Sequence, residues 1–467
     1  MNIATDYLVV GAGATGLAFT DALVAEIPDV DVTVIDRRNA PGGHWVDAYP
    51  FVRLHIPSAY YGVNSLPLGE DRIDEDGENA GFYERATGQE VREHFAEAAE
   101  RLTATGRVRV LTQHEHLGPN GGGEQVRDLA SGAVHDVAVR RKVVDARYLE
   151  ASIPATHTPS FTIALAARFV PVNDLPAAAG PASSYTVLGS GKTAVDACMW
   201  LLDDGVEPDR IRWVRPRDAW FLDRAAFQPL DQVGAIIEGI SLDAEAGAHA
   251  TDVDDLFERL EGSGRLSRID PSQRATMCRG TMLSARELRA LRQIEDVVRL
   301  GRVRGIEVDR IVLEHGEVPT GPDVLHVDCT ALGLRDAPPV PIFQPGRIVL
   351  QQVRQNSPSF NAALIAFVEA HRDDDEDKNR LCPPNPYAGS IEDWPRLMGV
   401  TFATEYAWMS EPDLTAWVAQ SRLNLLRALP DHLGDPAVQT SVQRYVTHVG
   451  PAIERLKELD GAAVRTG

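Results

Sequence analysis

The sequence has few cysteines, and no two of them are close together. None forms a Cys-x-x-Cys pair, which excludes a disulfide-reductase motif and a zinc knuckle; the four are Cys198, Cys278, Cys329 and Cys382. No apolar run approaches the roughly 20 residues that a membrane span needs. No basic and apolar leader precedes the first strand pattern, which starts near Asp6. We therefore expect a cytoplasmic protein with free thiols and no membrane segment.

Basic residues are also scarce. The chain has 46 Lys and Arg against 68 Asp and Glu, and its net charge is -22. This charge opposes binding to phosphate backbones or anionic lipids, so we predict no nucleic-acid partner. The acidic run 373–377 is interpreted as a solvated loop. A chain of 467 residues exceeds what one core usually serves, so two or three domains are expected.

The N-terminal residues predict a βαβ unit around a glycine-rich turn. An apolar strand at 6–10 leads into Gly-Ala-Gly-Ala-Thr-Gly, a helical pattern through Ala25, and a strand at 31–36. Gly11 permits the tight turn, and Gly13 lets a pyrophosphate approach the N–H groups at the helix start. Gly16 allows the helix to pack closely on the strand.

The strand after this turn ends in an acid, which indicates the kind of ligand that the turn binds. Asp36 stands about 20 residues after Gly16, where its carboxylate can accept hydrogen bonds from a ribose diol. A strand, a helix and this acid around one glycine motif predict a dinucleotide site.

A second unit of the same plan starts at residue 185. Its strand at 185–188 leads into Gly-Ser-Gly-Lys-Thr-Ala, and the next strand, at 210–215, ends in arginines in place of an acid. The guanidinium of Arg215 or Arg217 can bind a 2′-phosphate with two hydrogen bonds, which favours NADP over NAD; a surface ion pair is the alternative. Only one residue separates Gly189 from Gly191, so an ATPase P-loop is excluded.

Two such turns, followed in the first unit by Pro-Gly-Gly-His-Trp at 41–45, resemble the class B flavin monooxygenases, which include N-hydroxylases and Baeyer–Villiger enzymes. The resemblance covers roughly residues 1–365. It implies FAD at the first turn, NADPH at the second, and oxidation of a small organic substrate by O₂ through a C4a-peroxyflavin. The expected FAD contacts are Gly11, Gly13, Ala14, Gly16, Asp36, Arg37, Gly43, His44, Trp45 and, after a later strand, Asp328. The expected NADPH contacts are Gly189, Ser190, Gly191, Lys192, Thr193, Arg215 and Arg217.

The departures from the family bear on the reaction. The fingerprint Phe-x-Gly-x-x-x-His is absent before the second turn, where residues 169–176 read Phe-Val-Pro-Val-Asn-Asp-Leu-Pro, and the Baeyer–Villiger signature is missing. Where several relatives place an Asn beside the flavin, this chain has His55. It is a candidate donor to a peroxyflavin, a candidate acid or base near pH 7, or a packed core residue. Asn64 lies in a polar segment expected near the substrate. A flavin reductase without oxygen activation and a non-catalytic dinucleotide sensor remain the alternatives.

The fold expected is α/β, with two Rossmann-like dinucleotide-binding domains, a three-layer ββα FAD domain with an inserted NADP domain, and a helical C-terminal segment. The boundaries expected are 1–165 for the FAD domain with an antiparallel meander at 107–146, 166–320 for the NADPH domain, 321–390 for the return to the FAD domain, and 391–467 for the helical segment. Residues 251–305 read as helical and charged. The helical tail is a candidate homodimer contact. His114 and His116 share a strand face without an evident third ligand, so no metal site is predicted.

Overall fold

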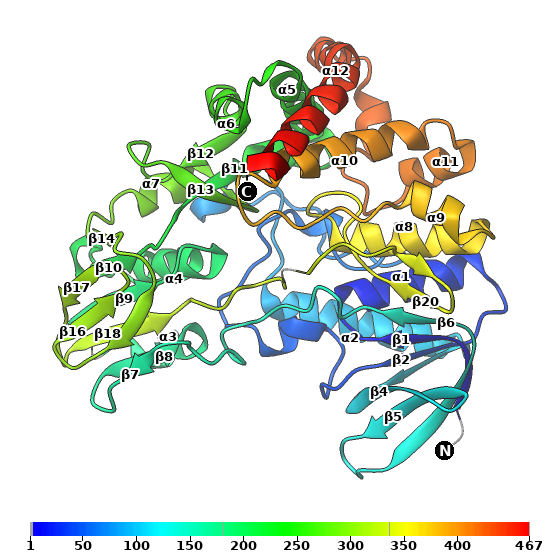
Figure 1. Cartoon of the computed structure of the whole chain (residues 1–467), viewed down its shortest axis with the longest axis horizontal. Coiled ribbons are helices and arrows are strands. Elements are labelled where there is room, and N and C mark those ends of the chain that lie inside the picture. The colour runs from blue at the N-terminus through cyan, green and yellow to red at the C-terminus, as the bar shows by residue number, and fades with distance from the viewer. Residues whose placement is uncertain (1–2, 181, 336, 467) are drawn as a thin grey trace.

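The computed structural model describes residues 3–180, 182–335 and 337–466 (Figure 1). The predicted first unit is present: β1 (Ile3–Val10), α1 (Ala14–Glu26) and β2 (Val32–Ile35) follow one another. β1 runs parallel to both β2 and β6 (Val134–Asp145), so it is an interior strand of its sheet. This position buries Leu8 and Val9 completely.

The first sheet has the order β19-β20-β6-β1-β2-β3, with the hairpin of β4 and β5 attached to β6. Its remaining strands are β3 (Val108–Leu111), β4 (His114–Asn120), β5 (Gly123–Asp128), β19 (Phe343–Gln344) and β20 (Arg347–Val349). Within the meander expected at 107–146, β4, β5 and the start of β6 pair antiparallel. The expectation is wrong for β3, which pairs parallel with β2, and for the end of β6, which continues beside β1.

The second sheet is parallel and has the order β14-β10-β9-β18-β8. Its strands are β8 (Arg168–Pro171), β9 (Ser184–Leu188), β10 (Ile211–Val214), β14 (Val297–Val298) and β18 (Val324–Asp328). β9 continues into α4 (Lys192–Asp203), as the second unit predicts. The strand β18 corrects one expectation. It pairs with β8 and β9, so the chain is still in the second sheet at Asp328, and it rejoins the first sheet at β19 and β20.

The interpretation of residues 251–305 as helical is wrong for much of this segment. Only α6 (Val253–Gly262) and α7 (Ala285–Leu291) are helices there. β12 (Leu266–Arg268) and β13 (Ala275–Leu283) flank β11 (Asp218–Asp223) in a small sheet. Strand pairing with a segment about 60 residues earlier decides the conformation of β13, and a local charge pattern carries no information about such a partner. A further sheet has the order β17-β16-β15-β7, from β7 (Thr162–Ile163), β15 (Val303–Ile306), β16 (Arg310–Leu313) and β17 (Gly316–Pro319).

Helices cover the first sheet and form the C-terminal part of the chain. α8 (Pro358–His371) packs against α1, and the long α12 (Pro436–Thr466) packs against α5 (Gly234–His249), as the red and green helices of Figure 1 show. The other helices are α2 (Gly88–Ala104), α3 (Leu175–Ala178), α9 (Asp375–Leu381), α10 (Trp394–Trp408) and α11 (Pro412–Gln420). The predicted helical tail is therefore confirmed. Within the described ranges, no helix combines the length and apolar character that crossing a membrane requires.

Candidate cofactor site

The first glycine-rich turn has the backbone that the sequence predicts for a phosphate cradle. Gly11 adopts a φ of 112°, in the region that favours glycine. A Cβ on Gly16 would lie 1.9 Å from the carbonyl oxygen of Gly11, so only glycine fits beneath the turn. Gly13 precedes α1 without a side-chain cap, and no acid occupies the first turn of that helix. The N–H groups at the helix start are therefore available to an anion.

Asp36 lies at the end of β2 and holds this turn in place. One carboxylate oxygen accepts the N–H of Ala12 at 2.8 Å, and the other accepts the N–H of Arg38 at 2.8 Å. Each oxygen keeps a lone pair for a further donor such as a ribose hydroxyl. Arg37 points to the exterior, where it forms an exposed ion pair with Glu150.

A cavity of about 1340 Å³, counted with its opening to solvent, extends from this turn; we call it the first cavity. Gly11, Gly13, Ala14, Asp36, Gly43 and His44 all line it. Behind them Trp45 is buried and donates its indole N–H to the hydroxyl of Tyr61 at 2.8 Å. Burial lowers the pKa of His44 to about 4, which keeps this ring neutral at pH 7. The structure therefore brings together most of the residues expected at the first site.

His55 also lines the first cavity, and its environment bears on the roles expected for it. Burial, with smaller contributions from the positive charges of Lys192 and Arg224, lowers its pKa to about 3. Its Nδ1 accepts the N–H of Met282 at 3.4 Å. His55 is therefore neutral near pH 7 and is suited to donating a hydrogen bond through Nε2. An acid–base role near pH 7 requires a group that titrates there, and His55 with its lowered pKa does not.

Asn64 does not line the first cavity. Its side-chain oxygen accepts hydrogen bonds from the hydroxyl of Ser421 and the N–H of Arg422, each at 3.0 Å. Arg422 in turn donates to the carbonyl oxygens of Ala59, Tyr61 and Val63. Asn64 thus joins the segment at 58–65 to the C-terminal part of the chain, which differs from the expected place beside the substrate.

The second glycine-rich turn repeats the first in its backbone. Gly189 has a φ of 131°, and a Cβ there would lie 2.5 Å from the carbonyl oxygen of Cys329. Gly191 precedes α4 with φ -88° and ψ -174°, against -86° and -170° for Gly13 before α1. The hydroxyl oxygen of Ser190 is buried and has no hydrogen-bond partner among the described residues. A buried polar atom of this kind, at a helix start, fits a ligand that supplies the missing partner.

Two further residues expected at this turn, unlike Ser190, have partners in the protein. Lys192 forms an ion pair with Asp196, one turn further along α4. The hydroxyl of Tyr49 donates to the same carboxylate at 2.5 Å and lies beside Thr193. The first turn of α4 is thereby tied to the segment that follows Gly43.

The two candidate arginines differ in environment. Arg215 is buried, stacks over the ring of Trp213 and lies 3.3 Å from the carboxylate of Asp218, so its charge is already balanced. Arg217 is exposed and forms no ion pair with any described residue. Burial and the nearby positive charges of Arg279 and Arg302 lower the pKa of Arg217. A cluster of like charges favours an anionic ligand, so Arg217 fits a phosphate better than Arg215 does.

Asp328 lies at the end of β18 and has a local role. One of its carboxylate oxygens accepts both the N–H of Thr330, at 2.9 Å, and its hydroxyl, at 2.6 Å. Cys329, the next residue, faces Gly189 of the second turn. Asp328 therefore shapes the neighbourhood of the second turn. It does not line the first cavity, although the resemblance implies an FAD contact for it.

Several residues of the first cavity were missed. Arg147 follows β6, which ends beside β1, so the rule that ligands bind at the carboxyl ends of parallel strands could have found it. Gln351, Gln352, Asn356 and Asn361 also line the cavity, from the stretch after β20. No glycine motif or charge pattern marks that stretch in the sequence, so it carried no signal.

The histidines of the hairpin have different partners. His116 lies 2.7 Å from the carboxylate of Glu124, on the neighbouring strand. His114 instead lies with Asp128 and His135, and one ligand atom from each falls within 4.8 Å of the others. The sequence pattern pairs His114 with His116 on one strand face, whereas β4, β5 and β6 bring His114, Asp128 and His135 together. Both oxygens of Asp128 already accept hydrogen bonds from residues 130 and 131.

Comparison with known proteins agrees with this geometry. The profile of an NAD(P)-binding Rossmann-like domain matches residues 9–53, which include the first turn and Asp36. The uncharacterized protein Rv2000 of Mycobacterium tuberculosis is 44% identical over 469 residues, which cover 100% of this chain and 86% of the relative. The chain belongs to the family of Rv2000.

More distant similarities connect this family to flavoproteins. MymA of M. tuberculosis, assigned as an FAD-containing monooxygenase, is 31% identical over 91 residues, 19% of this chain and 18% of MymA. The polycyclic ketone monooxygenase of Thermothelomyces thermophila has the same fold, with a TM-score of 0.51 and 11% identity over 99% of this chain and 88% of that enzyme. The resemblance to the class B flavin monooxygenases is thus confirmed at the level of fold.

Proposed function

We propose that the protein is an FAD-dependent, NADPH-using oxidoreductase, and that it acts as a monooxygenase on a small organic molecule with O₂ as co-substrate. One observation carries this proposal. Two glycine turns with the same backbone geometry begin two helices, and the strand after each turn ends in an acid in one case and in arginines in the other. This pairing is typical of one chain that distinguishes two dinucleotides.

The first cavity fits FAD. Gly13 and Gly43 approach so closely that a Cβ on either would lie 3.4 or 3.0 Å from the other's Cα, which leaves bare backbone facing the start of α1. A pyrophosphate group would accept hydrogen bonds from the N–H groups there, and Asp36 would accept the ribose hydroxyls. The volume of the cavity, and its extension to His55 and Tyr61, leave room for a ring system beyond the nucleotide.

The second turn fits NADPH. The orphaned hydroxyl of Ser190 lies at the start of α4, where a pyrophosphate would bind. Arg217, Arg279 and Arg302 form no ion pairs with described residues, so their charges remain available to a 2′-phosphate. Arg279 also lines the first cavity, so a dinucleotide bound at the second turn can reach toward it.

Bound FAD and NADPH would supply hydride transfer and the reaction of reduced flavin with O₂. The chain's own residues place these groups and exclude water from them. His55 stays neutral and presents a hydrogen-bond donor to the first cavity without adding a charge. Exclusion of water by bound substrate would favour transfer of oxygen to the substrate over its loss as hydrogen peroxide.

Three measurements test the proposal in sequence. The purified protein should be yellow and should release FAD on denaturation. It should then oxidise NADPH faster than NADH, because Arg217 favours the 2′-phosphate. With a substrate found by screening, ¹⁸O from ¹⁸O₂ should enter the product. A protein that takes up no FAD from an excess would overturn the proposal.

The absence of the Phe-x-Gly-x-x-x-His fingerprint favours a second function, that of an NADPH-dependent flavin reductase or dehydrogenase. NADPH turnover with an artificial acceptor, but without ¹⁸O incorporation for any substrate, would support this alternative. Bound cofactor with no turnover at all would support a dinucleotide sensor.

A further inference from the structure

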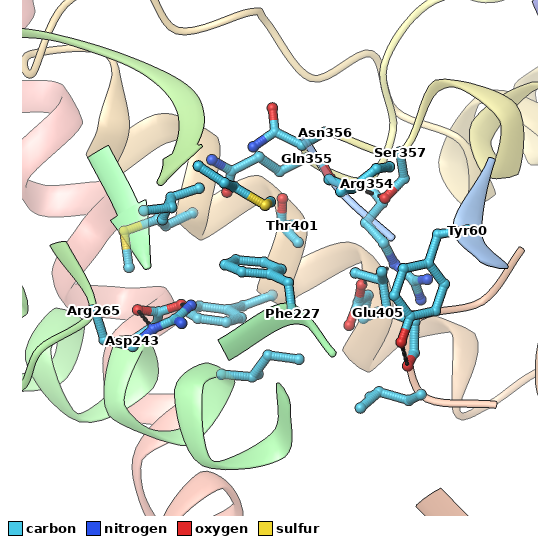
Figure 2. Close-up of a pocket in the computed structure, with 18 of the residues that line it drawn as sticks. Tyr60, Phe227, Asp243, Arg265, Arg354, Gln355, Asn356, Ser357, Thr401 and Glu405 are labelled. Carbon is cyan, nitrogen blue, oxygen red and sulfur yellow. Dashed lines mark hydrogen bonds and ion pairs between the residues drawn. The ribbon is translucent and has the colours of Figure 1, made fainter. Parts of the chain in front are cut away.

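A second cavity lies between the inserted small sheet and the C-terminal helices (Figure 2). Its volume is about 980 Å³, counted with its opening to solvent. Side chains of β11, α5 and α10 line it, together with residues 354–357 and the loop at 425–426. Apolar groups dominate the lining; they include Phe227, Ile240, Met282, Trp394, Met398 and Phe402.

Three chain segments separate the second cavity from the first, and neighbouring residues in each face opposite sides. His55 lines the first cavity and Ile56 the second. Likewise, Tyr61 lines the first cavity and Tyr60 the second. Pro358 lines the first cavity and Ser357 the second. The two cavities therefore share a wall that is a single layer of residues.

Asn356 is the residue of this wall that lines both cavities. Its φ is 53°, a left-handed conformation that asparagine tolerates better than most residues. Gly280 faces it, and a Cβ at Gly280 would lie 2.2 Å from the amide nitrogen of Asn356. The backbone N–H of Asn356 donates to Gln352 at 3.1 Å. The wall is thus built to place one polar side chain between the two cavities.

The charges on the wall of the second cavity are balanced. Arg265 donates two hydrogen bonds to the carboxylate of Asp243, at 2.8 and 2.6 Å, as Figure 2 shows. Arg354 donates to Glu405 at 2.6 Å and to Asn424 at 2.9 Å. Each cation has its own carboxylate, so a charged ligand would be buried without a counterion, at a high cost in free energy.

We propose that the second cavity holds the substrate, and that this substrate is an uncharged, predominantly apolar organic molecule whose reacting group reaches the first cavity past Asn356. The proposal rests on the function proposed above and names the substrate class of the same site. The apolar lining supplies binding energy from parts of the molecule remote from the reaction. The balanced ion pairs select against carboxylates and amines.

Binding to the FAD-loaded protein tests this proposal without turnover. The probes are 2-decanone and decanoate, which share a chain length and differ in charge at pH 8, and the measurement is isothermal titration calorimetry. We expect 2-decanone to bind at least tenfold more tightly than decanoate. Equal affinity for the two probes, or no binding of the ketone, would overturn the proposal.

A matched pair of variants locates the binding. Met398 lines the second cavity, whereas Met409 follows the same helix and is 72% exposed. Met398→Trp fills the cavity and should weaken 2-decanone binding at least tenfold, and Met409→Trp should leave it unchanged. Melting temperature and FAD content report whether each variant folds, and Ile240→Trp fills the cavity from α5 if Met398→Trp does not fold. A filled cavity with undiminished ketone binding refutes the location.

A third variant tests the charge argument. Glu405→Gln leaves Arg354 without its carboxylate, so the affinity for decanoate relative to that for 2-decanone should rise several-fold. An unchanged ratio would refute the role of the ion pair. Because the titrations can be repeated on protein stripped of FAD, a failure of flavin binding and a failure of the second cavity give separate results.

Discussion

The substitution Gly13→Ala tests cofactor binding at the first turn separately from the stability of the fold. Gly13 has a φ of -86°, which any residue adopts, and an added Cβ would lie 3.4 Å from the Cα of Gly43, an ordinary contact. Gly13→Ala should therefore fold, and the reduced freedom of the unfolded chain should raise stability by about 0.4–1 kcal/mol. The same methyl group would occupy the space through which a pyrophosphate reaches the start of α1.

The expected loss follows from the hydrogen bond that the methyl group prevents. A hydrogen bond to a charged group contributes about 1.5–3 kcal/mol, so the Kd for FAD should rise about 10- to 150-fold. FAD titration of the stripped protein measures the Kd, and thermal unfolding without FAD measures the stability. Gly450→Ala in α12, where nothing lies within 4 Å of the added Cβ, is the control. If Gly13→Ala binds FAD as tightly as the wild type, the first turn does not hold the pyrophosphate.

Three shorter predictions test the other charged and titrating groups. Arg217→Gln should raise the KM for NADPH at least tenfold and leave the KM for NADH unchanged. Equal effects on the two KM values would contradict binding of the 2′-phosphate by Arg217. Arg274→Gln, at another exposed arginine, is the control. The folded-state pKa of His55 is about 3, below its unfolded value, so its contribution to stability is complete above about pH 6.5 and is lost as pH falls. His55→Gln should therefore flatten the slope of unfolding free energy against pH by about 1.4 kcal/mol per pH unit near pH 5. An unchanged slope would show that His55 titrates normally. Glu287→Gln leaves Arg224 buried without its partner and should cost about 3–5 kcal/mol by chemical denaturation. Glu261→Gln, in a partly exposed pair, should cost at most about 1 kcal/mol, and similar costs for the two variants would contradict the role of burial.

The parts of the fold that local sequence could predict are those whose chemistry is local. A tight turn, a helix start and an acid at a strand end lie within about 30 residues, so the pattern around Gly11 and Asp36 is visible without a structure. The same holds for the turn at Gly189. The pairing of β13 with β11 and the position of β18 in the second sheet depend on distant strands, and they were accordingly missed.

The second cavity could not be predicted for the same physical reason. Its lining comes from residues near 56–60, 222–282, 354–357 and 394–426, which carry no shared motif. Apolar residues at these positions look like core in the sequence, because periodicity does not distinguish a side chain packed against another from one that faces a cavity. The sequence leaves the role of His55 open, because its pKa depends on burial and on the charges of residues distant in the chain.

The wall between the cavities depends on one buried ion pair. The guanidinium of Arg224 is fully buried and donates to the carbonyl oxygens of His55 and Met282, each at 3.3 Å, while Glu287 balances its charge. Met282 also donates its N–H to the ring of His55. The small sheet therefore holds His55 and Ile56 in place from the side opposite the first cavity. A substitution that disturbs this pair should affect FAD binding and apolar-ligand binding together, whereas substitutions in either cavity alone should affect one and spare the other.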